Sequence, residues 1–472
     1  MRVRSETDMR QSRTARATRR SIAFLVAAAL ALLPALPPPA EAAGNRAPPI
    51  IRDAEIETTI REFTDPVFAA AGLDINAVHV YLLGVDDINA FVAGGMNVFI
   101  YTGLLVRTQR PNQLVGVVAH ETGHIAGGHL ARVQEALRNA TIESIIGMVL
   151  GGAASAMGGG GGAGILVGPG TATQSMLQYT RTMEASADAA AMGFLDKTHQ
   201  SSRGLLEFFQ ILEQMEHTFY GKQNPYLNNH PLTESRIANV QAHINTSPYS
   251  DVPDPPAWVV AHKRMVAKLI GYLYPVDQVL NKYPESDKSV YGRYARSIAY
   301  FRIGQLQKAL PEIDSLIAEY PNDPYFQEQK GQILYQTGHG RDALVNYGKA
   351  VELAPDQPLI RMELAQVQLE QNDPTLLPAA IKGMKQVVLV ESDNPDAWRT
   401  LAIAYGKSGD EGMAALSLAE AAAANGNVRM AHLEAKSALE KLPQGSPAWI
   451  RAQDILTSVK PQGDDDTGGI PG

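Results

Sequence analysis

The segment HETGH at residues 120–124 constrains this chain most, because it places a glutamate between two histidines that are four residues apart. It lies in a stretch, Pro111 to Leu137, that starts with proline and has apolar residues at helical spacing, which predicts a helix. On a helix, His120 and His124 project from one face, one turn apart, so both imidazoles can bind one metal ion. Glu121 would then lie beside the open side of the metal and accept a proton from water that the metal has made more acidic.

The alternative interpretation of the two histidines is a solvated pair on a helix surface. The helix is rich in valine and is predicted to be buried, and burying two histidines and a glutamate is costly unless they have partners. The chain also contains no cysteine, which excludes disulfides, thiolate ligands and a cysteine nucleophile. Histidines and carboxylates must therefore supply any metal ligands, and we expect one Zn²⁺ per chain.

A third ligand is expected from a second helix, Tyr179 to Leu195, where Glu184 and Asp188 lie four residues apart on one face. Such a pair is usually a solvated helix face, but a zinc peptidase needs three protein ligands, and two histidines with one glutamate are a standard set. Asp188 would then bind the free ring nitrogen of a zinc histidine. His129 lies one position before Leu130, where a longer zinc motif has its third histidine, so we expect His129 to be structural or on the surface.

The N-terminal residues 1–42 are predicted to be a secretory signal peptide. They combine an arginine-rich region with the apolar run Ile22 to Leu36 and the small-x-small cleavage signal AEA at residues 40–42. A membrane anchor is the weaker alternative, because the run is short and prolines interrupt it. Removing this segment changes the net charge from −8 to −12, since it holds seven arginines and three acidic residues. This acidic balance argues against nucleic acid as a partner.

The following part of the chain, residues 43–247, is predicted to be the metal-binding domain. A strand is expected at Val78 to Leu83, and two apolar runs that flank Gly94-Gly95 predict a hairpin. A strand at the sheet edge beside the metal would bind substrate as an added strand, although an ordinary sheet edge is equally consistent. The glycine-rich loop at residues 151–170 allows three interpretations: a gate to the site, a disordered surface insertion, or a peripheral contact with a membrane.

The C-terminal half is predicted to be a helical repeat domain at residues 257–460. It follows a proline-rich linker at residues 248–256 and precedes an acidic, disordered tail at residues 461–472. Four positions recur after 34 residues, the period of tetratricopeptide repeats: Gly304, Ala309, Leu310 and Pro321 return as Gly338, Ala343, Leu344 and Pro355. A further, degenerate copy is expected around Trp398 and Gly409. A plain helical domain is the alternative, but the repeated offset argues against it.

These motifs together resemble the Ste24/HtpX superfamily of zinc metallopeptidases. The resemblance rests on HETGH, on Glu184-x-x-Ala187-Asp188, on residues 89–95 and on HPLTESR at residues 230–236. Export and the helical repeats make the chain most similar to BepA-type periplasmic proteases within that group. The expected fold is an α+β zincin-like metallopeptidase domain followed by an all-α tetratricopeptide-repeat solenoid.

The resemblance implies a function and a set of site residues. It implies a periplasmic endopeptidase that degrades misfolded or stalled outer-membrane proteins, assists their assembly, and binds the outer-membrane assembly machinery through its repeats. A non-proteolytic chaperone or assembly adaptor with a latent zinc domain is the alternative. The residues implied are zinc ligands, a base, a self-inhibiting fourth ligand and a residue near the reaction centre: His120, His124 and Glu184; Glu121; His230; and Arg236.

Overall fold

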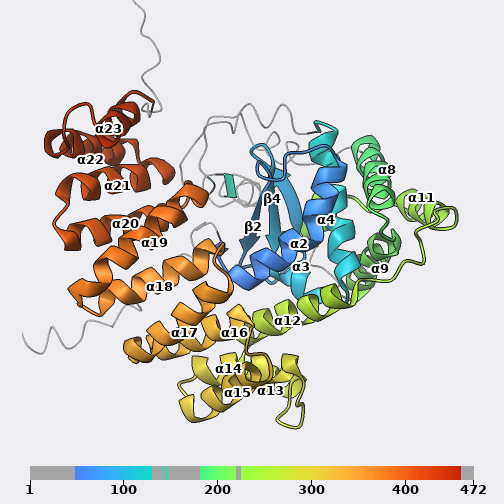
Figure 1. Cartoon of the computed structure of the whole chain (residues 1–472). Coiled ribbons are helices and arrows are strands. Elements are labelled where there is room, and N and C mark those ends of the chain that lie inside the picture. The colour runs from blue at the N-terminus through green and yellow to red at the C-terminus, as the bar shows by residue number, and fades with distance from the viewer. Residues whose placement is uncertain (1–47, 130–141, 143–144, 147–180, 219–224, 459–472) are drawn as a thin grey trace, which may run out of the picture. The chain divides into compact units, whose positions relative to one another are not determined.

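The computed structural model describes most of the chain: residues 48–129, 142, 145–146, 181–218 and 225–458 (Figure 1). The predicted signal peptide, the glycine-rich loop at residues 151–170 and the predicted C-terminal tail lie outside these described residues. Within the described part, no helix has both the length and the apolar character that crossing a membrane requires.

A four-stranded sheet forms the β part of the N-terminal domain. Its strands, in spatial order, are β1 (Ile50–Ile51), β2 (His79–Leu83), β4 (Asn97–Tyr101) and β3 (Ala90–Ala93). Strands β2 and β4 are parallel, whereas β3 and β4 form the predicted antiparallel hairpin. The turn residues Gly94 and Gly95 have φ angles of +61° and +102°, which side-chain-bearing residues rarely adopt. The hairpin therefore needs its two glycines, and it places β3 at the sheet edge.

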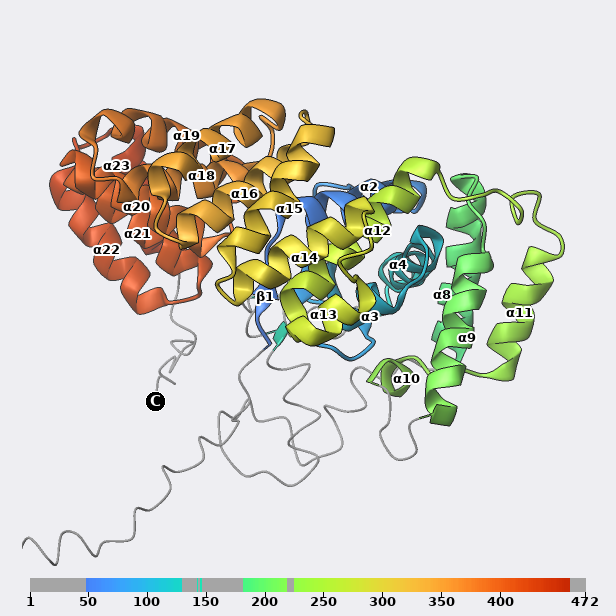
Figure 2. The same ribbon diagram turned by 90° about the horizontal axis from the view of Figure 1, so that it is seen from below.

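Helices surround this sheet and build the rest of the domain: α2 (Ala54–Ala70), α3 (Thr102–Arg107), α4 (Pro111–Ala126), α8 (Arg181–Lys197), α9 (Arg203–Thr218), α10 (Pro225–Asn229) and α11 (Glu234–Ile244). Helix α4 is the central one, with α8 and α9 on one side and α2 and α12 on the other (Figures 1 and 2). Its residues are buried from Pro111 through His124. The expectation that this helix reaches Leu137 is wrong, because it ends at Ala126, where Gly127 caps it and Gly128 turns the chain with φ +62°.

Two glycines let neighbouring helices approach α4 closely. A Cβ atom on Gly116 would lie 2.8 Å from the backbone nitrogen of Leu205 in α9. A Cβ atom on Gly123 would lie 2.7 Å from the carbonyl oxygen of Ala187 in α8. Both distances are shorter than ordinary contacts, so helix packing here depends on the missing side chain. The close approach at Gly123 brings α8, with its carboxylates, against the HETGH segment.

The C-terminal part is entirely helical among its described residues, as predicted. Its helices are α12 (Pro256–Leu273), α13 (Val276–Lys282), α14 (Val290–Arg302), α15 (Leu306–Glu319), α16 (Pro324–Gln336), α17 (Gly340–Leu353), α18 (Pro358–Glu370), a 3₁₀ turn η1 (Pro374–Leu376), α19 (Leu377–Val390), α20 (Pro395–Ser408), α21 (Glu411–Ala424), α22 (Val428–Lys441) and α23 (Pro447–Ser458). From α14 onward, consecutive helices pack in antiparallel pairs. This is the architecture of a tetratricopeptide-like solenoid.

The turns within the helix pairs explain which repeats the sequence pattern revealed. Gly304, Gly338 and Gly409 each adopt a left-handed conformation between two helices of a pair. The pair α18–α19 has Asn372 at this position, with φ +52°, and was missed because asparagine can also adopt this conformation. The 3₁₀ turn η1 follows Asn372 and displaces the next copy from the 34-residue period.

Helix α12 packs against both parts of the chain. Its Met265 and Leu269 belong to the core of the N-terminal domain, whereas Val266 and Ile270 pack with the first repeat helices. Lys268 of the same helix is buried and lies 2.8 Å from a carboxylate oxygen of Asp53, at the start of α2. Apolar and ionic contacts therefore join the two parts.

Candidate active site

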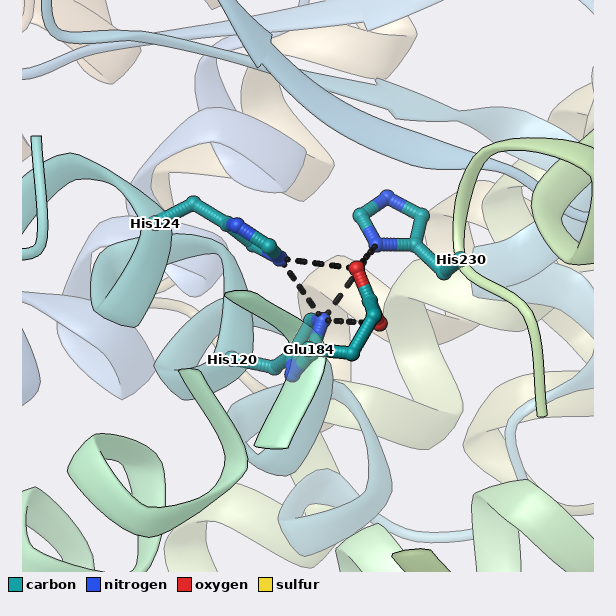
Figure 3. A group of neighbouring side chains, drawn as sticks. All are labelled: His120, His124, Glu184 and His230. Atoms are coloured by element: carbon teal, nitrogen blue, oxygen red, sulfur yellow. Dashed lines mark hydrogen bonds and ion pairs between the residues drawn. The ribbon is translucent and has the colours of Figure 1, made fainter. Parts of the chain in front are cut away.

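Four buried side chains from three parts of the chain meet beside α4. His120 and His124 come from α4, Glu184 comes from α8, and His230 lies directly after α10. In Figure 3 the carboxylate of Glu184 lies among the three imidazole rings. None of the four is accessible to solvent. Burying four polar side chains of this kind together costs free energy unless they bind a common ion.

The spacing of the donor atoms fits a tetrahedral metal ion. The four candidate ligand atoms all lie within 4.8 Å of one another. The measured separations are 3.0 Å for His124 Nε2–His120 Nε2, 3.3 Å for His120 Nε2–His230 Nδ1, 3.1 Å for His230 Nδ1–Glu184 Oε1 and 3.3 Å for His124 Nε2–Glu184 Oε1. Four donors at zinc-bonding distance in a regular tetrahedron are about 3.3 Å apart. The residues present therefore fit a tetrahedral metal ion with His230 as the fourth ligand.

A second layer of side chains orients the first. Asp188 Oδ1 lies 2.8 Å from His120 Nδ1, so the other ring nitrogen, Nε2, points to the group. Arg236, from α11, donates hydrogen bonds of 2.6 and 2.8 Å to Asp188 and forms an ion pair of 2.7 Å with Glu184. The structure thus places Asp188 and Arg236 beside the candidate ligands rather than among them.

His129 has a position that sequence reasoning missed. The sequence indicated only a structural or surface residue, whereas its Nδ1 lies 3.0 Å from Nδ1 of His124. His129 is half-buried, at the turn after α4. It therefore does for His124 what Asp188 does for His120, namely occupy the ring nitrogen that faces away from the candidate metal ligands.

The electrostatics keep three of the four candidate ligands deprotonated at neutral pH, and His120 is the exception. Burial lowers the pKa of His124 to about 2 and that of His230 to about 4, so both rings are neutral at pH 7. Burial acts against a charge on His120 as well, but its hydrogen bonds to Asp188 and Glu184 outweigh burial and raise its pKa to about 9. Burial also opposes the charge of Glu184, yet its contacts with the histidines hold its pKa well below the usual range. A metal ion would therefore displace the proton of His120 on binding.

Glu121 lies beside the four-residue group but outside it. Neither of its buried carboxylate oxygens has a hydrogen-bond partner among the described residues. Burial raises the pKa of Glu121 to about 8, and a nearby divalent cation would lower it again. Its Oε1 lies 3.4 Å from Nε2 of His230. The His230 ring thus lies between Glu121 and the three other donors.

Tyr226 is a further residue of the site that the sequence did not indicate. It is fully buried in α10, and its ring stacks on that of His230 with centroids 4.6 Å apart and an angle of 25° between the planes. Phe208 packs edge-on against the other side of this tyrosine. Tyr226 precedes His230 by four residues, the spacing of about one helical turn, which was the local signal available in the sequence. It fixes the plane of the His230 ring.

The edge strand β3 lies against α4, and its residues are all buried. Ile145, from the segment that follows α4, contributes to this burial. A Cβ atom on Gly94, in the β3–β4 turn, would lie only 2.4 Å from Cδ1 of Ile145. The end of the candidate substrate edge is therefore covered by a side chain of the chain itself.

Comparisons with known proteins relate this chain to a group of peptidases. Residues 51–244 match the family model described as Peptidase family M48. The chain is 24% identical over 395 residues to the beta-barrel assembly-enhancing protease of Yersinia pestis, which covers 81% of this chain and 79% of that protein. It is 23% identical over 406 residues to the protein of that name from Escherichia coli (strain K12), covering 84% and 82%. Metalloprotease LoiP of the same strain is 26% identical over 184 residues, covering 36% of this chain and 66% of that one.

Proposed function

We propose that this metalloendopeptidase, whose residues 51–244 match peptidase family M48, is a periplasmic zinc peptidase that degrades misfolded or stalled outer-membrane proteins. The observation that carries the catalytic part is the group of four donor atoms at tetrahedral spacing with Glu121 directly beside it. The predicted signal peptide supports the periplasmic location, and the names of the two relatives that match over both parts of the chain support the substrate class.

His120, His124 and Glu184 are proposed to hold the metal during catalysis. A bound Zn²⁺ would supply Lewis acidity that polarises the scissile carbonyl and makes water more acidic. Glu121 accepts the proton from the attacking water and passes it to the leaving amine. Its two oxygens suit this task, because they are buried and make no hydrogen bond to another described residue. Asp188 holds the ring of His120 in the orientation that leaves Nε2 free to bind.

His230 is proposed to inhibit the resting site. Its Nδ1 lies 3.3 Å from Nε2 of His120 and 3.1 Å from Oε1 of Glu184, the separation expected between two ligands of one metal ion. Its Nε2 faces Glu121. While the ring is in this position, water and substrate cannot reach the space beside Glu121. Only the fraction of molecules in which His230 has moved away would cleave peptides. Arg236 forms ion pairs with Glu184 and Asp188. It therefore holds Glu184, and through Asp188 also His120, in place when His230 moves away.

The two parts of the chain are proposed to divide the work. The edge strand β3 would bind an extended substrate by strand addition once its covering side chain moves. The helical repeats would bind unfolded or misassembled proteins and the outer-membrane assembly machinery, with at most peripheral membrane contact. The position of His230 also favours a second candidate: a repeat-based chaperone or assembly adaptor whose zinc domain is latent.

Metal analysis together with casein hydrolysis tests the proposal. Glu121→Gln should retain one zinc per chain and the thermal unfolding temperature of the wild type, but cleave no casein, because an amide cannot accept the proton. His230→Ala should retain zinc and cleave faster. His79→Ala, which changes an exposed histidine, provides the matched control. Cleavage by Glu121→Gln at the wild-type rate would eliminate Glu121 as the base, and inactivity of both the wild type and His230→Ala would favour the adaptor.

A further inference from the structure

A cleft that is separate from the group of candidate metal ligands lies where the peptidase domain meets the repeats. Its volume is about 290 Å³. It is lined by residues from three parts of the chain: Thr108 from the connection between α3 and α4, His262 and Lys263 from α12, and Tyr283 and Tyr291 from the first repeat helices and their connection. None of these side chains has a part in the proposed catalytic mechanism. The cleft therefore needs an explanation of its own.

The protonation of His262 can be deduced from its neighbours. The hydroxyl of Thr108 donates its hydrogen to the carbonyl oxygen of Leu105 at 2.7 Å. The same oxygen lies 2.8 Å from Nε2 of His262 and must accept in that contact, so Nε2 carries the ring proton. Burial lowers the pKa of His262 to about 4, so at neutral pH the ring has only this one proton. Nδ1 is then a bare hydrogen-bond acceptor.

This acceptor has nothing to bind within the described chain. The ring of His262 is 2% exposed, and Nδ1 has no hydrogen-bond partner among the described residues. A buried acceptor without a donor is unfavourable, and a bound group with an N–H or O–H would relieve that cost. One water molecule could donate to Nδ1, but its share of liquid volume is about 30 Å³, a small part of the cleft.

The other walls of the cleft suit an aromatic ring. Tyr283 and Tyr291 offer aromatic surface, and Val266 adds an aliphatic side chain. The ammonium group of Lys263 lies 5.8 Å from the centroid of the Tyr291 ring, so a cation already lies beside aromatic surface here. A flat ring would therefore find aromatic partners, a cation and one acceptor within the same cleft.

We propose that this cleft binds an aromatic group carrying one hydrogen-bond donor, namely the side chain of a tryptophan or tyrosine in a bound polypeptide. The donor binds Nδ1 of His262, and the ring packs against Tyr283 and Tyr291. Because the cleft joins the residues just before α4 to the first repeat helices, one bound side chain contacts both parts of the protein. It is a docking site away from the metal, and it does not depend on the proposed catalytic roles.

Binding of small probes to the full-length chain tests the proposal. Saturation-transfer NMR titrations would compare indole with 1-benzothiophene, which has nearly the same shape but no N–H group. Indole should bind saturably, and benzothiophene about tenfold more weakly, the equivalent of one net hydrogen bond. N-acetyl-tryptophanamide represents the side chain within a polypeptide and should bind at least as tightly as indole.

Variants locate the binding. His262→Phe removes the acceptor and should weaken indole binding about tenfold while leaving benzothiophene binding unchanged. Tyr291→Leu removes an aromatic wall at a half-buried position and should weaken both probes. His79→Phe, which replaces an exposed histidine, is the control. If His262→Phe does not fold, the two-probe comparison and Tyr291→Leu still decide the matter. Equal affinity for the two probes, unchanged binding in Tyr291→Leu, or failure of N-acetyl-tryptophanamide to bind would overturn the proposal.

Discussion

Replacing Gly123 by alanine should separate the metal ligands without touching any of them. The new Cβ atom would lie 2.7 Å from the carbonyl oxygen of Ala187 and 2.9 Å from its Cα, whereas ordinary contact starts at 3.4 Å. Helix α8 must therefore move away from α4 by about 0.7 Å, as judged from these distances. Glu184 lies one turn before Ala187 in α8 and must move with it. The geometry of the candidate metal site would change, although every ligand remains.

The size of the effect can be estimated from two opposing contributions. Overpacking a buried contact costs about 1–3 kcal/mol, while alanine stabilises a helix by about 1 kcal/mol relative to glycine. Gly193→Ala in α8 is the matched control, because a Cβ atom there meets nothing within 4 Å and should show the stabilisation alone. The difference in the free energy of unfolding between the two variants then measures the strain at Gly123. Metal binding must restore the strained packing, so the Kd for zinc should rise by about 5- to 150-fold.

The chain allows this measurement to be made on the peptidase core alone. Trp258 packs against Phe63 in that core, with ring centroids 4.9 Å apart. The two other tryptophans lie in the repeats, so Trp398→Phe and Trp449→Phe leave one fluorescent reporter. Urea unfolding followed at this reporter gives the stability, and competition with a chelator gives the zinc affinity. If Gly123→Ala matched Gly193→Ala in both quantities, the close approach of the two helices would not position the ligands.

Three further predictions concern charges. Arg236→Met removes the arginine partner of two buried carboxylates and should destabilise the peptidase core by about 3–5 kcal/mol in the same urea assay; a loss below 1 kcal/mol would contradict this. Asp188→Asn cannot hold His120 as firmly and should weaken zinc binding about 10- to 100-fold in the chelator assay. Burial raises the pKa of Glu363 to about 8 and that of its neighbour Glu328 above the usual range, so the folded state binds more protons than the unfolded state above pH about 4.5. Stability should therefore fall as pH rises from about 4.5 to 8, and Glu363→Gln should reduce this slope in urea titrations; an unchanged slope would refute it.

Local patterns in the sequence were sufficient to predict the main helices and strands and about half of the residues of the candidate site. A helix places side chains four residues apart on one face, so HETGH and the pair Glu184 and Asp188 predicted which groups could face a metal. Glycines with positive φ marked the β3–β4 hairpin and three of the repeat turns. The repeat with Asn372 was missed because two residue types can adopt one backbone conformation.

Only the tertiary structure decided which of these groups meet, and at what distance. The approach of Glu184 to the two histidines depends on helix packing at Gly123, which involves residues far apart in the chain. The contact of His129 with His124 leaves no periodic trace in the sequence, and neither does the nitrogen of His262 that has no hydrogen-bond partner among the described residues. Periodicity reports which face of an element a residue occupies, whereas distances between elements follow from the close packing of all side chains at once.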